Sequence, residues 1–310
     1  MITDTKNSAC ELLDYFYSNR DLAVRMKQRA SDLFKLIVST SERIARRTQA
    51  QKEELLVCAT RDKYKVYGDL IMSNLHKLEK GQKTAEVENY YDENSPIVKI
   101  PLDIRLNPAQ NAQKFYNEYR KLDTAEKHLT KLIEAGEQEL DYIDSVFDCL
   151  TRATTDGEIS ELRIELAEQG YVKHQKLKGK PPKAEPPLKF ISDEGYTILV
   201  GRNNKQNDKL TLKDSDKTDM WLHTKNIHGS HAIIKCNGTE PPEETIVLAA
   251  QLAAYHSKGR TSAQVPVDYT YVRFVKKPTG SKPGMVIFTN NKTLYVNPDE
   301  KLVGRLKVKK

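Results

Sequence analysis

The chain has 310 residues, of which 38% are hydrophobic and 30% charged, with a net charge of +7 at neutral pH; this is typical of a protein with a long solvated helical part. The sequence has no run of about 18 apolar residues, which excludes a membrane span. The N-terminus lacks the basic region and the apolar stretch of a secretory signal, which excludes an export signal of that kind. The four cysteines stand far apart without a Cys-x-x-Cys pair, so we expect free thiols in a reducing cytoplasm.

The positive charge is concentrated in the C-terminal part of the chain. Residues 171–310 contain 25 Lys and Arg against 13 Asp and Glu, whereas residues 1–170 contain 25 against 30. A basic half attached to an acidic half favours an anionic partner at the basic end. Nucleic acid is favoured there over a merely soluble basic domain.

Residues 1–172 are expected to form a helical coiled-coil region. Two proline-free stretches predict long helices over about 8–78 and about 109–154. In the second stretch, eleven positions from Phe115 to Leu150 are spaced alternately by four and three residues, and nine of them are apolar. That spacing is the seam of a coiled coil. Because the first stretch carries a matching but weaker seam, we expect the two helices to pair as an antiparallel hairpin.

A small β cap is expected between the two helices, over about 84–106, where alternating residues and a polar turn favour two short strands. Tyr90 and Tyr91 in this cap are exposed-aromatic candidates for contact with a partner, although one of them is expected to pack in a core. A short helix is predicted over about 157–169. The Lys- and Pro-rich segment 173–188 has no apolar pattern and is expected to be a flexible basic linker.

Residues 189–310 show the rhythm of strands, interrupted by one helix over about 241–259 with prolines and glutamates at its start and a glycine at its end. The expected fold class is therefore α+β. A long antiparallel helical coiled-coil hairpin with a small β cap is followed by a mixed β-sheet domain with a packed helix.

The stretch DMWLHTKNIHGSHAIIK, residues 219–235, holds the only tryptophan and three of the seven histidines. Strand alternation places Asp219, Trp221 and His223 on one face, opposite a core-like face, with His231 near them across a strand pair. A metal site and a Ser-His-Asp triad are disfavoured because the supporting motifs are missing. An RNA-binding surface, with Trp221 stacking on a base, and a packed core around a buried Trp221 remain equally open.

Two more polar clusters, GRNNKQND and VKKPTGSK, supply the amide, guanidinium and ammonium groups that phosphates and base edges need, although turns explain them as well. We expect a binding protein rather than an enzyme, with no metal and no cofactor. The candidate RNA-binding residues are Arg202, Asn203, Asn204, Lys205, Asn207, Asp208, Asp219, Trp221, His223, Gly229, Ser230, His231, Lys276, Lys277 and Lys282.

Several motifs together resemble the NFACT family over nearly the whole chain and in the family's order. They include YGDLIMSNLHKLEKG, VENYY, IPLDIRLNPAQNAQKFYNEYRKL, ILVGRNNKQND, DMWLH, SHAIIK and VKKPTGSKPGMVIFT. The resemblance implies a role in ribosome-associated quality control, with binding to the large ribosomal subunit, to rRNA and to tRNA. In the full-length family member this binding supports C-terminal alanine tailing of stalled nascent chains. The resemblance also implies that the coiled coil reaches toward a stalk-base protein, and that the C-terminal domain binds RNA.

The chain departs from the family pattern in two places. The family's N-terminal domain and helix-hairpin-helix are not recognisable, so we expect a fragment or a naturally split protein that does not support tailing alone. His228 stands where many members have proline, which concerns the shape of one loop. Two alternative functions stay open: a fibronectin-binding surface adhesin, and a metal-dependent RNA-processing enzyme centred on Asp219, His223 and His231.

Overall fold

The computed structural model describes residues 28, 30–172 and 185–308. The start of the first predicted helix and most of the predicted linker lie outside these residues. Within the described ranges, no helix is both long and apolar enough to cross a membrane. The three cysteines that the structure describes, Cys58, Cys149 and Cys236, are buried free thiols.

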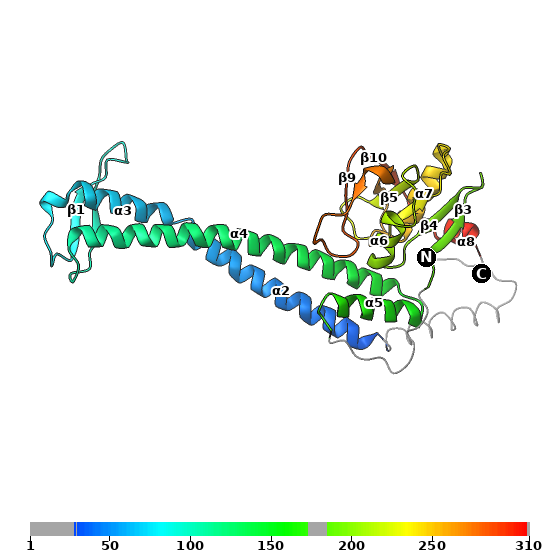
Figure 1. Ribbon diagram of the computed structural model, residues 1–310, viewed down its shortest axis with the longest axis horizontal. Coiled ribbons are helices and arrows are strands. Elements are labelled where there is room, and N and C mark those ends of the chain that lie inside the picture. The colour runs from blue at the N-terminus through cyan, green and yellow to red at the C-terminus, as the bar shows by residue number, and fades with distance from the viewer. Residues whose placement is uncertain (1–27, 29, 173–184, 309–310) are drawn as a thin grey trace. The chain divides into compact units, whose positions relative to one another are not determined.

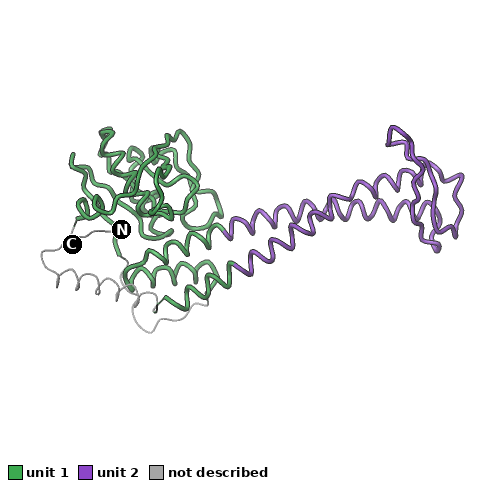
Figure 2. The backbone as a smooth tube through the Cα atoms, turned by 180° about the vertical axis from the view of Figure 1, so that it is seen from behind, with its two compact units in different colours: residues 1–41, 141–310 green, residues 42–140 purple. Residues whose placement is uncertain are grey.

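Two compact units make up the chain, and Figure 2 colours them separately. One joins residues 1–41 to residues 141–310, and the other comprises residues 42–140. The predicted division at residues 173–188 stays a prediction.

Long helices carry both units, and Figure 1 shows α2 running beside α4. The predicted antiparallel helical hairpin is confirmed, but its first helix is interrupted. The hydroxyl of Thr60 donates to the carbonyl oxygen of Val57 at 2.8 Å, and a side chain that bonds to nearby backbone in this way competes with the helical ladder. The helical elements of this region are α2 (Ser31–Cys58), α3 (Arg61–Ser73), η1 (Leu75–Lys77) and α4 (Pro108–Arg152).

A two-stranded antiparallel sheet forms the cap, with β1 (Thr84–Glu88) paired to β2 (Ile97–Pro101). Its apolar side packs on α3 and on the start of α4. Tyr90 and Tyr91 follow β1 and are 52% and 57% exposed, so the expectation that one of them packs in a core is wrong. Their rings lie 4.8 Å apart, and the Tyr91 hydroxyl donates to Asp69 at 2.7 Å. The pair is a fixed aromatic surface on the cap.

A six-stranded sheet in the order β10-β7-β5-β6-β4-β3 forms the centre of the C-terminal region. All its pairings are antiparallel, which corrects the expectation of a mixed sheet. The helical connections from β4 to β5 and from β6 to β7 each pass over one strand, so the parallel strands that they join are not neighbours. The strands are β3 (Leu188–Ile191), β4 (Thr197–Val200), β5 (Met220–Thr224), β6 (Ala232–Ile234), β7 (Val265–Tyr271) and β10 (Lys292–Val296).

Both faces of this sheet are covered. On one face, Met220 and Leu222 pack in a core with the alanine-rich side of α7 (Glu243–Tyr255). On the other face, Trp221 packs in a second core with Leu210 of α6 (Asn204–Leu212). The remaining elements are α5 (Asp156–Glu168), η2 (Val272–Phe274), β8 (Val275–Lys276), β9 (Ile287–Phe288) and α8 (Glu300–Leu306).

Because the opposite face of the strand is core-like, the face that carries Asp219, Trp221 and His223 was expected to be wet or partly covered. Instead, Asp219 and Trp221 are fully buried, because α6 and the segment that follows β7 cover that side. Alternation along the strand was predicted correctly, but it separates two cores rather than a core from solvent.

Candidate nucleic-acid interface

A cavity of about 470 Å³ lies between the C-terminal part of α4 and the sheet. It brings six of the predicted residues together with the loops 225–229 and 283–286 and with Tyr142 and Ser145 of α4. The predicted residues that line it are Asn204, Asn207, Trp221, His223, Gly229 and His231.

Aromatic rings dominate the inner wall of the cavity. The Trp221 ring stacks on His223, with centroids 5.8 Å apart, and meets His231 edge-on at 5.3 Å. Phe288 lies 4.7 Å from the indole. The indole Nε1 is buried without a hydrogen-bond partner, a state that costs free energy unless an acceptor is supplied. The wall therefore contains a hydrogen-bond donor without a partner among flat aromatic rings.

Both histidines are neutral at physiological pH. Burial lowers the pKa of His223 to about 4, and burial together with His223 lowers the pKa of His231 well below its ordinary value. The Nδ1 atom of His231 lies 2.8 Å from the Thr211 hydroxyl. Neutral imidazoles are hydrogen-bonding groups for base edges, whereas a phosphate prefers a cation.

The cluster GRNNKQND is not a loop. Asn203 caps α6, its side chain accepting from the backbone N–H of Gln206 at 2.9 Å. Its Nδ2 donates to Glu161 at 2.5 Å, and the Arg202 guanidinium donates to Glu158 at 2.5 Å. Both side chains therefore have partners within the chain, on the acidic face of α5, and their contact with RNA stays a prediction.

The next residues of α6 are also bound internally. Asn204 donates to Ser145 at 2.9 Å and to Glu165 at 3.2 Å, while Lys205 pairs with Glu168 at 2.8 Å. Asn207 accepts from the backbone N–H of His231 at 3.1 Å. Asn204 and Asn207 still line the cavity, whereas Lys205 pairs with α5.

Two of the three predicted lysines form hydrogen bonds within the chain. Lys277 donates to Asp208 at 2.8 Å and to the carbonyl oxygen of Lys282 at 2.8 Å. Lys282 donates to Gln169 at 3.2 Å and lies over the Tyr142 ring at 5.3 Å. Among the described residues, no hydrogen bond or ion pair engages the exposed Lys276 side chain. Of these three lysines, Lys276 fits the predicted phosphate contact best.

Asp219 and Ser230 have structural partners. Asp219 pairs with Lys235 and accepts from the backbone N–H of Cys236 at 2.9 Å. The Ser230 hydroxyl accepts from Arg152 at 3.0 Å, and within the described residues it donates to no histidine, so the triad arrangement does not form. No group of three or more metal-ligating side chains gathers anywhere in the described part of the chain, which contradicts the proposed metal centre.

Gly229 has a packing role beside the cavity. A Cβ at this position would lie 2.8 Å from the Cβ of Ser257 and 2.8 Å from the Thr224 hydroxyl, which is closer than real side-chain atoms approach. The backbone of the 225–229 loop can therefore approach Ser257, just after α7, only because residue 229 is glycine.

Sequence reasoning missed the residues that α4 and α5 contribute. Tyr142, Ser145 and Arg152 were assigned to a coiled coil alone, yet all three contact the sheet domain or its cavities. Tyr142 and Ser145 lie outside the predicted coiled-coil seam. Their place on another side of the helix was the sequence signal that a second surface packs there.

The fold and the cavity define a helical-arm protein whose helix base packs on a basic α+β domain. Residues 2–185 match the family described as NFACT N-terminal and middle domains, and residues 187–290 match the NFACT protein RNA binding domain. The chain belongs to the NFACT family, as its motifs indicated.

Relatives support this assignment. The chain is 40% identical over 304 residues to the Rqc2 homolog RqcH of Bacillus subtilis (strain 168), covering 97% of this chain and 53% of that protein. It is 38% identical over 302 residues to the Rqc2 homolog RqcH of Streptococcus suis (strain 05ZYH33), covering 97% and 54%. The chain thus spans about half the length of the curated relatives it matches.

A solved structure has a similar fold. The C-terminal part of the fibronectin/fibrinogen-binding protein from Streptococcus suis is 34% identical, with a TM-score of 0.73, covering 92% of this chain and 99% of that one. The α+β fold with its long helix pair is therefore shared with an experimentally determined relative.

Proposed function

We propose that this chain is the RNA-binding part of a ribosome quality control factor. The observation that carries the proposal is the cavity, in which the rings of Trp221, His223 and His231 gather beside the amides of Asn204 and Asn207. Most of the residues that line this cavity lie within residues 187–290, which match the NFACT protein RNA binding domain, and α4 supplies the rest. An unpaired base has a flat apolar face and polar edges, and neutral rings beside amides offer contacts for both.

Cations near the cavity hold the backbone of the same strand. Lys225 lines the cavity with 46% of its side chain exposed, and its nearest carboxylate oxygen, on Asp268, is 3.9 Å away. Lys276 is exposed on the strand that pairs with Phe288 of the cavity wall. Phosphate contacts by such lysines position the strand, while the rings and amides contact the base.

In this proposal, the whole factor has the finer role that the resemblance to the NFACT family implies. It binds the large ribosomal subunit, with rRNA and tRNA, and supports C-terminal alanine tailing of stalled nascent chains. The exposed Tyr90–Tyr91 pair on the cap contacts a ribosomal stalk-base protein. In this chain, the proposed function is binding rather than catalysis.

The salt dependence of RNA affinity tests the proposal. Binding of a single-stranded RNA should weaken with salt, with a log–log slope of roughly −0.7 per phosphate contact. Lys225→Gln should make the slope shallower by about 0.7, because one contact is lost. Lys121→Gln, an exposed lysine on α4, is the matched control and should leave the slope unchanged. A flat salt response of the unaltered chain would contradict the proposal.

A second function is favoured by the solved relative, whose name describes a fibronectin/fibrinogen-binding protein. Capture of the chain by immobilised fibronectin at physiological salt, surviving nuclease treatment, would support it. Co-sedimentation with large ribosomal subunits, in place of fibronectin capture, supports the ribosomal role.

A further inference from the structure

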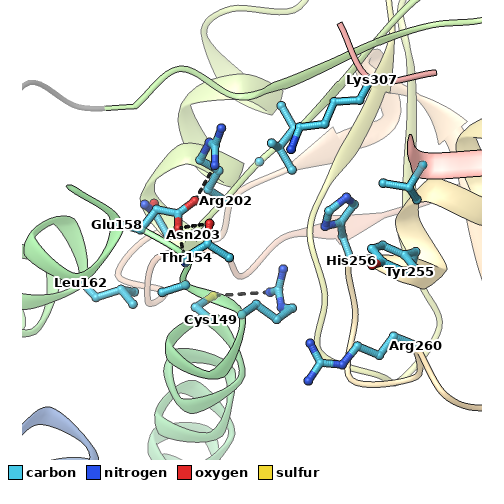
Figure 3. Close-up of a pocket in the computed structure, with 15 residues that line it drawn as sticks. Cys149, Thr154, Glu158, Leu162, Arg202, Asn203, Tyr255, His256, Arg260 and Lys307 are labelled. Atoms are coloured by element: carbon cyan, nitrogen blue, oxygen red, sulfur yellow. Dashed lines mark hydrogen bonds and ion pairs between the residues drawn. The ribbon is translucent and has the colours of Figure 1, made fainter. Parts of the chain in front are cut away.

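A second cavity, of about 290 Å³, lies apart from the aromatic one, where the end of α4 and the start of α5 meet α7 and α8. Figure 3 shows Arg202 and Glu158 on one side of it and His256 and Arg260 on the other, with Lys307 near its edge. All these residues belong to the same compact unit.

The cavity has a surplus of positive charge. Four cationic side chains and one carboxylate line it: Arg152, Arg202, Arg260 and Lys307, with Glu158.

Two of these cations are already neutralised. Arg202 pairs with Glu158, and Arg152 pairs at 2.9 Å with Asp148, which lies behind the lining. In the described part of the chain, the Arg260 and Lys307 side chains have no hydrogen bond or ion pair and are exposed at the mouth. The cavity therefore has two uncompensated cations at its entrance, while the two guanidinium groups within it are held by partners of the chain.

An unpartnered polar atom points to a ligand independently of the charges. The Nε2 atom of His256, which lines the cavity, is buried without a hydrogen-bond partner. Burial, followed by the fields of Arg152, Lys307, Arg202 and Arg260, lowers the pKa of His256 to about 3. The ring is therefore neutral, and the fields of all four cations converge on it.

We propose that this cavity binds a phosphomonoester, the terminal phosphate of a free nucleotide or of an RNA chain. Guanidinium groups bind phosphate oxygens through paired hydrogen bonds, and a monoester carries nearly two negative charges, which the two free cations match. The volume is near the lower limit for small-ligand sites, about 300 Å³, so one phosphate with its sugar or nucleoside fits. Leu162, Leu188 and Val303 give the lining an apolar part for that group.

The site goes beyond the RNA interface proposed above and rests on it only if the ligand is an RNA end. Calorimetric titration of the full chain compares three probes: inorganic phosphate, adenosine 5′-monophosphate against adenosine, and an RNA octamer with a 5′-phosphate against the same octamer with a 5′-hydroxyl. Arg260→Gln and Lys307→Gln remove exposed cations without partners, and Lys301→Gln on α8 is the matched control.

We expect the monophosphate to bind and adenosine not to bind. Each of the two cavity variants should weaken phosphate-dependent binding about tenfold, and the control should not, since each variant removes one charge-assisted contact. A tenfold gain from the 5′-phosphate on the octamer identifies an RNA end, and no gain identifies a free nucleotide. The 5′-hydroxyl octamer reports the aromatic interface separately. Absence of phosphate-dependent binding by every probe, or binding that both cavity variants leave unchanged, would overturn the proposal.

Discussion

Trp221 combines two roles that sequence reasoning treated as alternatives. It is fully buried in a core with Ile233 and Leu210, as the packed-core interpretation required. It also forms part of the wall of the aromatic cavity, with an indole N–H that has no partner. The indole is inaccessible to water in this structure, so its N–H edge meets a ligand only if the cavity wall shifts when the ligand binds.

Trp221→Phe tests that edge. Phenylalanine keeps most of the apolar volume, so the melting temperature should stay near that of the unaltered chain. RNA affinity should fall about tenfold if the indole donates to a base, because the donor is lost. Filter binding with one oligonucleotide measures the effect, and circular dichroism verifies the fold. An unchanged affinity with an intact fold would show that Nε1 does not contact RNA.

Glu165 is a buried carboxyl whose ionisation opposes folding. It accepts from Tyr142 at 2.9 Å and from Asn204, but its second oxygen is buried without a partner. Burial raises its pKa from 4.5 to about 6. A carboxyl with a higher pKa in the folded chain binds protons more tightly when folded, so its contribution to stability is full below pH 4.5 and is lost as pH rises through 6.

Glu165→Gln should remove this dependence. At pH 4 the variant and the unaltered chain should have similar free energies of unfolding. Above pH 7 the variant should be more stable by up to about 2 kcal/mol, following the size of the pKa shift. Chemical denaturation at both pH values measures the difference. The assigned direction of the pKa shift would be contradicted if the stability of the variant, relative to that of the unaltered chain, fell between pH 4 and pH 7.5.

At the scale of elements, the heptad pattern predicted the helix pair because a coiled-coil seam is a local repeat that packing preserves. Thr48 lies opposite Gly136 of that seam, so close that a Cβ on the glycine would clash with its hydroxyl. The internal role of α6 was not predictable in the same way. Arg202 and Asn203 have the composition of an RNA-binding loop, and only their distant partners Glu158 and Glu161 on α5 show that they are satisfied within the chain.

Gly68 lets α3 approach α4 closely. A Cβ at Gly68 would lie 2.6 Å from a ring carbon of Tyr116. Gly68→Ala should therefore destabilise unit 42–140 by about 1–3 kcal/mol, as overpacking does. Gly304→Ala on α8 is the matched control, because nothing lies within 4 Å of the added methyl, and it should be neutral or slightly stabilising. Thermal unfolding followed at 222 nm compares the two; equal melting temperatures would contradict the close packing.

At the scale of the whole molecule, the unit that holds both cavities is assembled from two distant parts of the sequence. Arg152 donates to Ser230, Asn204 donates to Ser145, and Lys258 pairs with Asp144 at 2.8 Å. The C-terminal end of α4 therefore packs on the sheet domain and lines its cavities, while the rest of α4 is one helix of the coiled coil. A boundary drawn from composition at residues 173–188 divides this unit.

Two truncated chains distinguish the packing unit from the composition boundary. Residues 188–310 alone lack Tyr142, Ser145 and Arg152, so both cavities lose a wall, and the buried amides of α6 lose partners. We expect this fragment to melt at a lower temperature than the full chain and to bind single-stranded RNA at least tenfold more weakly, since unpaired buried polar groups are costly.

The second truncation replaces residues 42–140 with a short turn. Arg47 and Glu139, which pair at 2.8 Å just beyond the cut, show that the two helices run close enough there for a turn to join them. This chain should keep the RNA affinity and phosphate binding of the intact protein, while losing any contact that the Tyr90–Tyr91 surface makes with the ribosome. If residues 188–310 alone retain full affinity, α4 is not part of the RNA site, and the composition boundary is the functional one.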